Sequence, residues 1–433
     1  MKPQFLIAAP ASDSGKTTLT LGLLRLLADQ GRRPQPFKCG PDYLDPVHHS
    51  LAARRPSVNL DTFMMSEAHV REVYARHMAG ADIGVVEGMM GLFDGADRME
   101  GSSASIAALL GLPVILIVNA QAMAYSAAPL LQGFSQFHRG VRVAGAIFNF
   151  VNSPGHFRYL SQACADVGVE ALGYVPENDG LRLPSRHLGL AISPENDYEA
   201  VIRRISAHIG QTVDIRRLLE ITSVQPVAEP PPARPASTPG HLRIAIARDE
   251  AFNFFYHENL QAFSRWGDVT AFSPLRDASV PEADLVYLAG GYPELHLDQL
   301  SANAPMRDSI RAYCERGGRV LAECGGLMYL GRQIVDAQGR GHPMAGFLGI
   351  ETSMREARLS LGYREVADGA RMYRGHEFHH SVLREIQPLA SASRVTDARG
   401  REVGTKIYHK LNVWASYVHF YWGELDGPPF LGA

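Results

Sequence analysis

The sequence predicts an α/β protein with two doubly wound domains, and three observations support this fold class. Short β-rich apolar runs alternate with longer helical patterns from residue 1 to about residue 220. A Pro-rich polar segment covers residues 224–240, and the alternation restarts after it. Such alternation is typical of parallel βαβ units. We therefore predict domains over residues 1–223 and 241–433, joined by an extended linker over 224–240.

The individual elements follow from local pattern. Apolar, β-branched runs bounded by Gly or Pro are predicted as buried strands. In the first half these runs are QFLIAAP (4–10), IGVVEGM (83–89), PVILIVNA (113–120) and VAGAIFNFV (143–151). In the second half they are LRIAIARD (242–249), DLVYLAGG (284–291) and RVLAECGG (319–326). The stretch GKTTLTLGLLRLLADQG (15–31) is predicted as a helix.

Composition narrows the class of partner. The 433 residues include 42 Lys+Arg and 45 Asp+Glu, which gives a net charge of -3. This balance gives no reason to expect nucleic acid or an acidic membrane surface as a partner. The four cysteines show no CxxC or Cys/His metal spacing, so a reduced, cytoplasmic protein is expected. The N-terminal apolar run is too short for a signal peptide or a membrane span.

A phosphate-binding loop is predicted at APASDSGKTTLT, residues 9–20, between a strand and a helix. The segment ends like a P-loop, GxxxxGK[ST], although Pro10 replaces the first glycine. A chance Gly-Lys-Thr at a helix start is the alternative, and the strand before the helix argues against it. The residues predicted to bind the nucleotide are Ser14, Gly15, Lys16, Thr17 and Thr18.

Carboxylates follow predicted strands in the first domain. Asp42 and Asp45 lie in PFKCGPDYLDP, and Glu87 and Asp94 lie in VVEGMMGLFDG. Loops after the strands of a parallel sheet gather at one edge, where ligands bind. Carboxylate oxygens there suit Mg²⁺ bridging phosphates, although any single acid can be a solvated loop charge.

The segment RVLAECGGLMYLG, residues 319–331, predicts a nucleophile. A strand, Cys324, two glycines and a helix form the geometry of a nucleophile elbow. The N–H of Gly325 can stabilise an oxyanion, with a second donor from Gly290 or Gly291 after another strand. The expected base is His419, within a strand-like run near the C-terminus.

Two packing alternatives stay open at this stage. Cys324 can be a small buried residue, and His419 can be a core histidine with satisfied hydrogen bonds. Cys39, Cys164 and Cys314 are predicted to serve packing alone.

With these motifs in view, the whole chain except the linker resembles the cobyrinate a,c-diamide synthases, glutamine-dependent ligases of corrin biosynthesis. The first domain looks like the dethiobiotin synthetase branch of P-loop folds, and the second is similar to class I glutamine amidotransferases. In that family the P-loop normally lacks its first glycine, as here at Pro10. The segments that carry the resemblance are AAPASDSGKTT, FKCGPDYLDP, NLDTFM, VVEGMMGLFDG, LAGGYPELH, AECGGLMYL, RGHEFHHS and ASYVHF.

The resemblance implies an ATP- and glutamine-dependent amidation of the a and c acetates of cobyrinate or hydrogenobyrinate in cobalamin biosynthesis, with Mg²⁺ as cofactor. Cys324 and His419 would release ammonia from glutamine, with Gly291 and Gly325 as oxyanion donors. ATP would activate a substrate carboxylate as an acyl phosphate, which ammonia converts to an amide. The positions that the resemblance ties to metal are Thr17, Asp45 and Glu87, and those tied to substrate are Asp42, Tyr43, Leu44 and Asp94.

A basic segment is a further substrate candidate. RGHEFHHS offers Arg374, His376 and His379 to hold carboxylates of a tetrapyrrole, and a solvated charged loop is the alternative. No other partner is expected except a second copy of the chain, since monomer and homodimer both stay open.

Two departures from the family pattern leave the substrate open. Tyr421 stands where typical class I amidotransferases carry Glu, two residues after the catalytic His, although the corrin-amidating branch also lacks that Glu. The ending VHFYW differs from the usual His-Leu-His-Phe. The alternatives are the same chemistry on sirohaem or nickel sirohydrochlorin, a glutaminase feeding a cell-wall or other acceptor, and a P-loop scaffold ATPase. ATPases of that kind usually carry a second lysine, where this chain has Ala11.

Overall fold

The computed structural model describes residues 1–181, 197–225, 241–391 and 393–430 of the chain. It divides into two units, Met1–Ala233 and Arg234–Ala433, and each is described by itself. Most of the predicted linker lies outside the described residues, and Val224 still pairs within the sheet of the first unit. Among the described residues, no helix combines the length and the apolar character that crossing a membrane requires.

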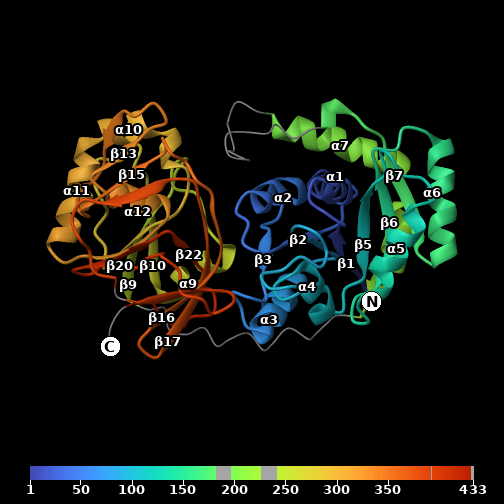
Figure 1. Ribbon diagram of the computed structural model, residues 1–433, viewed down its shortest axis with the longest axis horizontal. Coiled ribbons are helices and arrows are strands. Elements are labelled where there is room, and N and C mark those ends of the chain that lie inside the picture. The colour runs from blue at the N-terminus through green and yellow to red at the C-terminus, as the bar shows by residue number, and fades with distance from the viewer. Residues whose placement is uncertain (182–196, 226–240, 392, 431–433) are drawn as a thin grey trace. The chain divides into compact units, whose positions relative to one another are not determined.

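The first unit is built on an eight-stranded sheet (Figure 1). The predicted strands of the first half form β1, β4, β5 and β6, which confirms the parallel α/β expectation. A short strand, β8 (Ser223–Val224), pairs antiparallel with β1. The other strands, all parallel to their neighbours, follow the order β3 (Val58–Leu60), β2 (Pro34–Cys39), β4 (Ile83–Glu87), β1 (Lys2–Ala8), β5 (Val114–Asn119), β6 (Val143–Asn149) and β7 (Glu170–Val175).

Helices pack in groups around this sheet (Figure 1). Helix α1 packs on α2 and α7, while α3 contacts α4 and α5 contacts α6. Arg25 of α1 ties the first group together, because it donates to Leu51 O and Ala52 O of α2 and pairs with Glu199 of α7. The helical segments are α1 (Lys16–Asp29), α2 (Asp45–Ala53), α3 (Glu67–Met78), α4 (Ser103–Leu110), α5 (Ala127–Gln136), α6 (Pro154–Val167), η1 (Asp179–Leu181), α7 (Tyr198–Thr212) and α8 (Ile215–Ile221).

Strand register brings distant residues to one edge of the first sheet. Glu87, the last residue of β4, lies opposite Ile7 of β1 and opposite Lys38 of β2. The loops that follow β1, β2 and β4 therefore start side by side at the carboxyl ends of the strands, the usual ligand edge of an open α/β sheet.

The second unit also contains a mainly parallel sheet (Figure 1). The three strands predicted in this half form β9, β11 and β12, and only the edge strand β20 runs antiparallel to its neighbour. The strands follow the order β10 (Gly267–Phe272), β9 (Leu242–Ala247), β11 (Leu285–Leu288), β12 (Arg319–Glu323), β21 (Val413–Ser416) and β20 (Tyr408–Lys410). Helical segments beside it are α9 (His257–Trp266), η3 (Pro293–Leu295), α10 (Leu297–Ala302), α11 (Ala304–Glu315) and α12 (Gly325–Leu330).

Two smaller sheets add to the second unit, and the sequence analysis did not predict them. One has the order β14 (Gly341–Pro343), β13 (Gln333–Val335), β15 (Ile350–Ser353) and β18 (Val382–Glu385). The other has the order β19 (Arg394–Asp397), β16 (Ser360–Asp368), β17 (Arg371–His379) and β22 (Val418–Phe420), and all of its pairs are antiparallel. His419 lies on β22 of the second of these sheets, and the pairing of β22 with β17 fixes its position.

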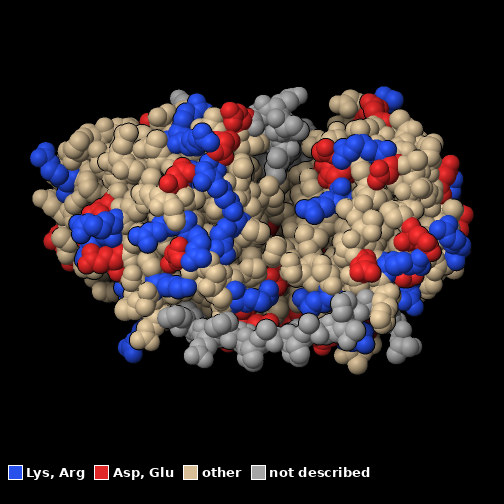
Figure 2. Space-filling model, turned by 180° about the vertical axis from the view of Figure 1, so that it is seen from behind, with Lys and Arg blue, Asp and Glu red and all other residues tan. Residues whose placement is uncertain are grey.

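The surface carries both signs of charge. Lys and Arg side chains and Asp and Glu side chains both occur on each unit in the face that Figure 2 shows. This mixture agrees with the small net charge of -3.

Candidate active sites

The predicted P-loop forms a turn between β1 and α1. Gly15 has a φ of 94°, and a Cβ there would lie 2.1 Å from Nδ2 of Asn149. Glycine is therefore required both by the left-handed conformation and by the close approach of Asn149. Asn149, at the end of β6, donates to Ser14 O at 3.0 Å. The sequence analysis did not single out Asn149, because its contact depends on the neighbouring strands.

Lys16 and Thr17 open the first turn of α1, and Thr18 follows. The Nζ of Lys16 donates to Met90 O at 2.7 Å and to Ala11 O at 3.3 Å. Burial lowers the pKa of Lys16, and Glu87 opposes this shift. The lysine thus bonds to loop carbonyls, and the N–H groups at the start of a helix such as α1 favour an anion.

The three residues predicted to bind metal converge at one point. Thr17 Oγ1 donates to Glu87 Oε1 at 2.7 Å. Lys38 Nζ donates to the same Oε1 at 2.9 Å and to Asp45 Oδ2 at 2.5 Å. A hydroxyl and two carboxylates are hard oxygen donors, so this set fits Mg²⁺ in chemistry. The sequence analysis gave Lys38 no role.

Electrostatics keeps Glu87 ionised although it is fully buried. Burial alone would raise the pKa of Glu87, but Lys38, His49 and Thr17 together hold it well below its usual range. His49 Nε2 lies 2.7 Å from Glu87 Oε2. Burial alone would lower the pKa of Lys38, but Asp45 and Glu87 outweigh it and raise that pKa. The edge of the sheet therefore holds a charged carboxylate and a charged ammonium.

The predicted substrate residues of this unit lie on two loops. Asp42 Oδ1 accepts hydrogen bonds from the N–H groups of Leu44 (2.8 Å) and Asp45 (3.0 Å), and so shapes the turn before α2. Tyr43 and Leu44 are half-buried on the same turn. Asp94 is exposed, and its Oδ2 accepts from Gly91 N at 3.0 Å. The two aspartates hold loop conformations, and both loops border the predicted phosphate site.

In the second unit, Cys324 sits on the predicted elbow. It follows the end of β12 directly and precedes α12. Its φ of 46° and ψ of -99° are strained for a residue with a Cβ, as expected of a nucleophile turn. Cys324 N donates to Ser416 O at 2.7 Å, and Cys324 O accepts from Met328 N at 3.0 Å. Both bonds hold the elbow against β21 and α12.

The predicted oxyanion donors lie next to each other. A Cβ on Gly325 would lie 3.3 Å from Gly291 N, so the main chains of the two glycines approach closely. A Cβ on Gly290 would lie 2.3 Å from Cε1 of His419. The segment Gly290–Gly291 therefore connects the elbow with the predicted base, and both positions leave no room for a side chain.

His419 lies in the interior of the second unit. It is opposite His376 of β17 in strand register, and the two rings stack at 5.0 Å between centroids. His376 Nδ1 lies 3.0 Å from the hydroxyl of Tyr256. Burial, then His376 and His379, lower the pKa of His419 well below its usual value. This environment favours the neutral imidazole, whose nitrogen carries a lone pair.

The surroundings of Cys324 favour the neutral form of its thiol. Burial raises the pKa of the Cys324 thiol, Glu294 adds to the shift, and the N–H of Gly325 opposes it. The sulfur lies 3.9 Å from Phe378 O. A narrow pocket borders Cys324, and Gly291, Phe378 and Ser381 also line it.

The predicted basic cluster is not gathered at one site. Arg374 lies on the exposed side of β17 and pairs with Glu365 at 2.9 Å. His376 is buried against His419, and burial lowers its pKa to about 3. His379 borders the pocket of Cys324 and a larger pocket. The three side chains thus have different surroundings, and their joint role in binding carboxylates stays a prediction.

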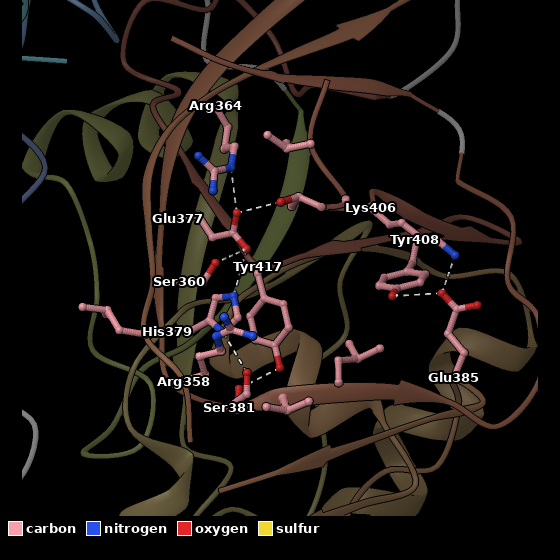
Figure 3. A pocket seen from close by; sticks show the side chains of 16 residues that line it. Arg358, Ser360, Arg364, Glu377, His379, Ser381, Glu385, Lys406, Tyr408 and Tyr417 are labelled. Atoms are coloured by element: carbon pink, nitrogen blue, oxygen red, sulfur yellow. Dashed lines mark hydrogen bonds and ion pairs between the residues drawn. The ribbon is translucent and has the colours of Figure 1, made fainter. Parts of the chain in front are cut away.

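Glu377, which the sequence analysis overlooked, forms the centre of a network in a larger pocket (Figure 3). Its carboxylate accepts from Arg364 (2.7 Å) and Thr405 (2.7 Å) and pairs with His379 (2.8 Å). Burial would raise the pKa of Glu377, but His379, Thr405 and Arg364 lower it to about 2.

This larger pocket has about 1330 Å³ of empty volume, including space open to solvent. His379 and Ser381 border both pockets, so they belong to the wall between them. The ring of Tyr417 stacks on His379 at 3.6 Å, and its hydroxyl lies 2.7 Å from Ser381 Oγ (Figure 3). This wall connects the Glu377 network with the pocket of Cys324.

Comparison with known proteins covers both units. Residues 5–190 match the model of the CobQ/CobB/MinD/ParA nucleotide binding domain, and residues 243–426 match the CobB/CobQ-like glutamine amidotransferase domain. The chain is 43% identical over 429 residues to a hydrogenobyrinate a,c-diamide synthase of Rhodobacter capsulatus, which covers 95% of this chain and 97% of that protein.

Other relatives are similar over the same length. A cobyrinate a,c-diamide synthase of Salmonella typhimurium is 39% identical over 440 residues, with 97% of this chain and 95% of that protein covered. A hydrogenobyrinate a,c-diamide synthase of Brucella anthropi is 40% identical over 424 residues, with 96% and 97% covered. The chain thus belongs to the cobyrinate and hydrogenobyrinate a,c-diamide synthase family, a family of glutamine-dependent ligases, and combines a nucleotide-binding domain with a glutamine amidotransferase domain.

Proposed function

We propose that this chain converts the a and c acetates of cobyrinate or hydrogenobyrinate into amides, using ATP and the side-chain amide of glutamine. The observation that carries the proposal is the combination within one chain of an elbow cysteine and a P-loop bordered by buried carboxylates. The full-length relatives, which bear both substrate names, support the same reaction class.

In the amidotransferase unit, Cys324 is the nucleophile. His419 takes the proton of the thiol, and the sulfur attacks the amide carbon of glutamine. The N–H groups of Gly291 and Gly325 stabilise the oxyanion that forms. The carbon–nitrogen bond then breaks, and the proton held on His419 leaves with ammonia. Water hydrolyses the remaining thioester to glutamate and restores the thiol.

In the nucleotide-binding unit, an oxygen of a substrate acetate attacks the terminal phosphorus of ATP, and ADP leaves. The product is an acyl phosphate, which has a far better leaving group than a carboxylate. Ammonia attacks its carbonyl carbon, and inorganic phosphate departs. The phosphates are held by the P-loop residues Ser14, Gly15, Lys16, Thr17 and Thr18. Asp42, Tyr43, Leu44 and Asp94 border the substrate.

Thr17, Asp45 and Glu87 would hold Mg²⁺, which when bound neutralises charge on the phosphate oxygens. The donor set of one hydroxyl and two carboxylates supports this assignment. We further propose that the enzyme works in the cytoplasm, which agrees with four unpaired cysteines.

The test is product analysis. The protein is incubated with ATP, Mg²⁺ and glutamine labelled at the amide nitrogen, and with each of four acids: cobyrinate, hydrogenobyrinate, sirohaem and nickel sirohydrochlorin. Mass spectrometry should find two labelled amides on cobyrinate or hydrogenobyrinate. Amidation of sirohaem or nickel sirohydrochlorin alone would show that the substrate is one of these instead. ATP hydrolysis without any labelled amide would favour a scaffold ATPase.

A further inference from the structure

Lys38 is the side chain at which three elements of the first unit meet. It lies near the end of β2, directly opposite Glu87 of β4, and Asp45 begins α2. Its Nζ is 2.5 Å from Asp45 Oδ2, 2.9 Å from Glu87 Oε1 and 4.0 Å from Asp42 Oδ2. The side chain is only 4% exposed. One ammonium therefore joins both carboxylates that the proposed function gives to the metal.

The carboxylate of Glu87 finds its partners within the chain. Glu87 is fully buried, and a buried carboxylate without a compensating cation would be strongly destabilising. Its Oε1 accepts from both Lys38 and Thr17, and its Oε2 faces His49. Every oxygen of Glu87 thus has a partner from the chain, and Lys38 supplies the positive charge.

We propose that Lys38 is an internal cation that competes with the divalent metal for Asp45 and Glu87, so that metal binds firmly only together with nucleotide. This inference rests on the proposed function, in which these two carboxylates are metal ligands. It makes Lys38 a positioning residue that acts through the carboxylates.

Competition follows from space and charge. A magnesium ion binds oxygen at about 2.0–2.1 Å, so at Oε1 of Glu87 it would lie beside the ammonium. Two cations that share one carboxylate repel each other. The phosphates of a nucleotide add negative charge at the start of α1, next to Thr17 and Lys16, and this charge compensates the second cation. By linkage, metal and nucleotide then raise each other's affinity.

The test measures binding of Mn²⁺ to the full chain by electron paramagnetic resonance, without nucleotide and with a non-hydrolysable ATP analogue. Lys38→Met keeps the length of the side chain and removes its charge. We expect Lys38→Met to bind Mn²⁺ without nucleotide at least about tenfold more tightly than the unmodified protein. We also expect the analogue to raise its Mn²⁺ affinity by a smaller factor than in the unmodified protein. Combining Lys38→Met with Glu87→Gln should remove the new site.

Lys2→Met is the matched control, because it removes a lysine that donates to backbone carbonyls in the same unit. It should bind Mn²⁺ like the unmodified protein. Equal Mn²⁺ affinity of Lys38→Met and the unmodified protein without nucleotide would overturn the proposal.

A second comparison decides the matter even where Lys38→Met does not fold. The unmodified protein and Glu87→Gln should bind Mn²⁺ equally weakly without nucleotide and differ once the analogue is added. A Glu87-dependent site in the unmodified protein without nucleotide would contradict the competition. These binding measurements use no tetrapyrrole. Their outcome therefore does not depend on whether the proposed tetrapyrrole is the substrate.

Discussion

At the scale of single residues, Cys324 offers the clearest separation of the two chemistries. Cys324→Ser replaces the thiol with a far weaker nucleophile and leaves the nucleotide-binding unit unchanged. We expect glutamine-dependent amidation to be lost and amidation with high ammonium chloride to continue. Product formation with each nitrogen source measures this, and Cys314→Ser in α11 should retain both activities. Full use of glutamine by Cys324→Ser would remove the nucleophile assignment.

Lys16 belongs to the proposed phosphate site, where ATP would activate the substrate carboxylate. Lys16→Ala removes a charged donor from the phosphate site, and the loss of such a preorganised donor typically costs roughly 2–4 kcal/mol of transition-state stabilisation. Amidation should collapse with glutamine and with ammonium alike. Steady-state kinetics with ATP as the varied substrate measures the effect, and unchanged ATP turnover would exclude the phosphate role.

Glu323, just before the nucleophile, should make stability depend on pH. It is buried, it accepts from Trp422 Nε1 at 3.0 Å, and burial raises its pKa to about 8. In the unfolded chain a glutamate ionises near its ordinary value of about 4.3. Between these two values the folded state holds more protons, so the free energy of unfolding falls as pH rises.

Glu323→Gln should remove this dependence. The slope of the free energy of unfolding against pH should flatten by up to about 1.4 kcal/mol per unit between roughly pH 5 and 8. Urea titrations at several pH values measure it. Parallel pH profiles for the two proteins would mean that Glu323 does not bind an extra proton in the folded state.

The roles of some site residues could be predicted from short sequence motifs, and the roles of others depend on contacts between distant parts of the chain. Short motifs of consecutive residues predict the roles of Gly15, Lys16, Thr17 and Cys324. Lys38 gains its role from Glu87, which is 49 positions away in the chain. Such a contact depends on strand register, which the residue pattern of a single sequence does not reveal.

At the scale of elements, the glycine segment after β11 should be sensitive to any side chain. A Cβ on Gly290 would lie 2.3 Å from Cε1 and 2.8 Å from Nδ1 of His419, so Gly290→Ala should displace the imidazole. Overpacking of this kind costs about 1–3 kcal/mol. We expect loss of glutamine-dependent amidation with ammonium-dependent amidation retained, measured as product formed from each nitrogen source.

Gly133→Ala is the control for this change. Gly133 lies in α5, and an added Cβ would meet nothing within 4 Å. The variant should keep both activities and gain up to about 1 kcal/mol from better helix propensity. An active, glutamine-using Gly290→Ala enzyme would mean that His419 tolerates displacement or is not the base.

The central strands of both units were predictable, and the two smaller sheets of the second unit were not. Strands such as β1 and β5 are continuous apolar runs because both faces are buried. Strand β17, RMYRGHEFH, mixes charged and apolar side chains because only part of it is buried. We interpreted part of that segment as a basic cluster for substrate carboxylates, with a charged loop as the alternative, and its pairing with β22 brings His376 beside His419.

At the scale of the whole molecule, the proposed function assigns one half-reaction to each unit. The chain divides between Ala233 and Arg234, inside the segment predicted as a Pro-rich linker, and each unit has its own mainly parallel sheet. Composition and alternation led us to predict domains over residues 1–223 and 241–433, because each half repeats the βαβ pattern by itself. The choice between cobyrinate and hydrogenobyrinate depends on recognition of one macrocycle, for which no local sequence motif exists.

The central claim is that ATP activates a substrate acetate for attack by ammonia from glutamine. The most direct measurement starts from a corrin substrate whose acetates carry a heavy oxygen isotope. An acyl phosphate requires one labelled oxygen to leave with phosphorus for each amide formed. We therefore predict that the inorganic phosphate gains one labelled oxygen per amide, as measured by mass spectrometry. Amide formation with unlabelled phosphate would contradict the account.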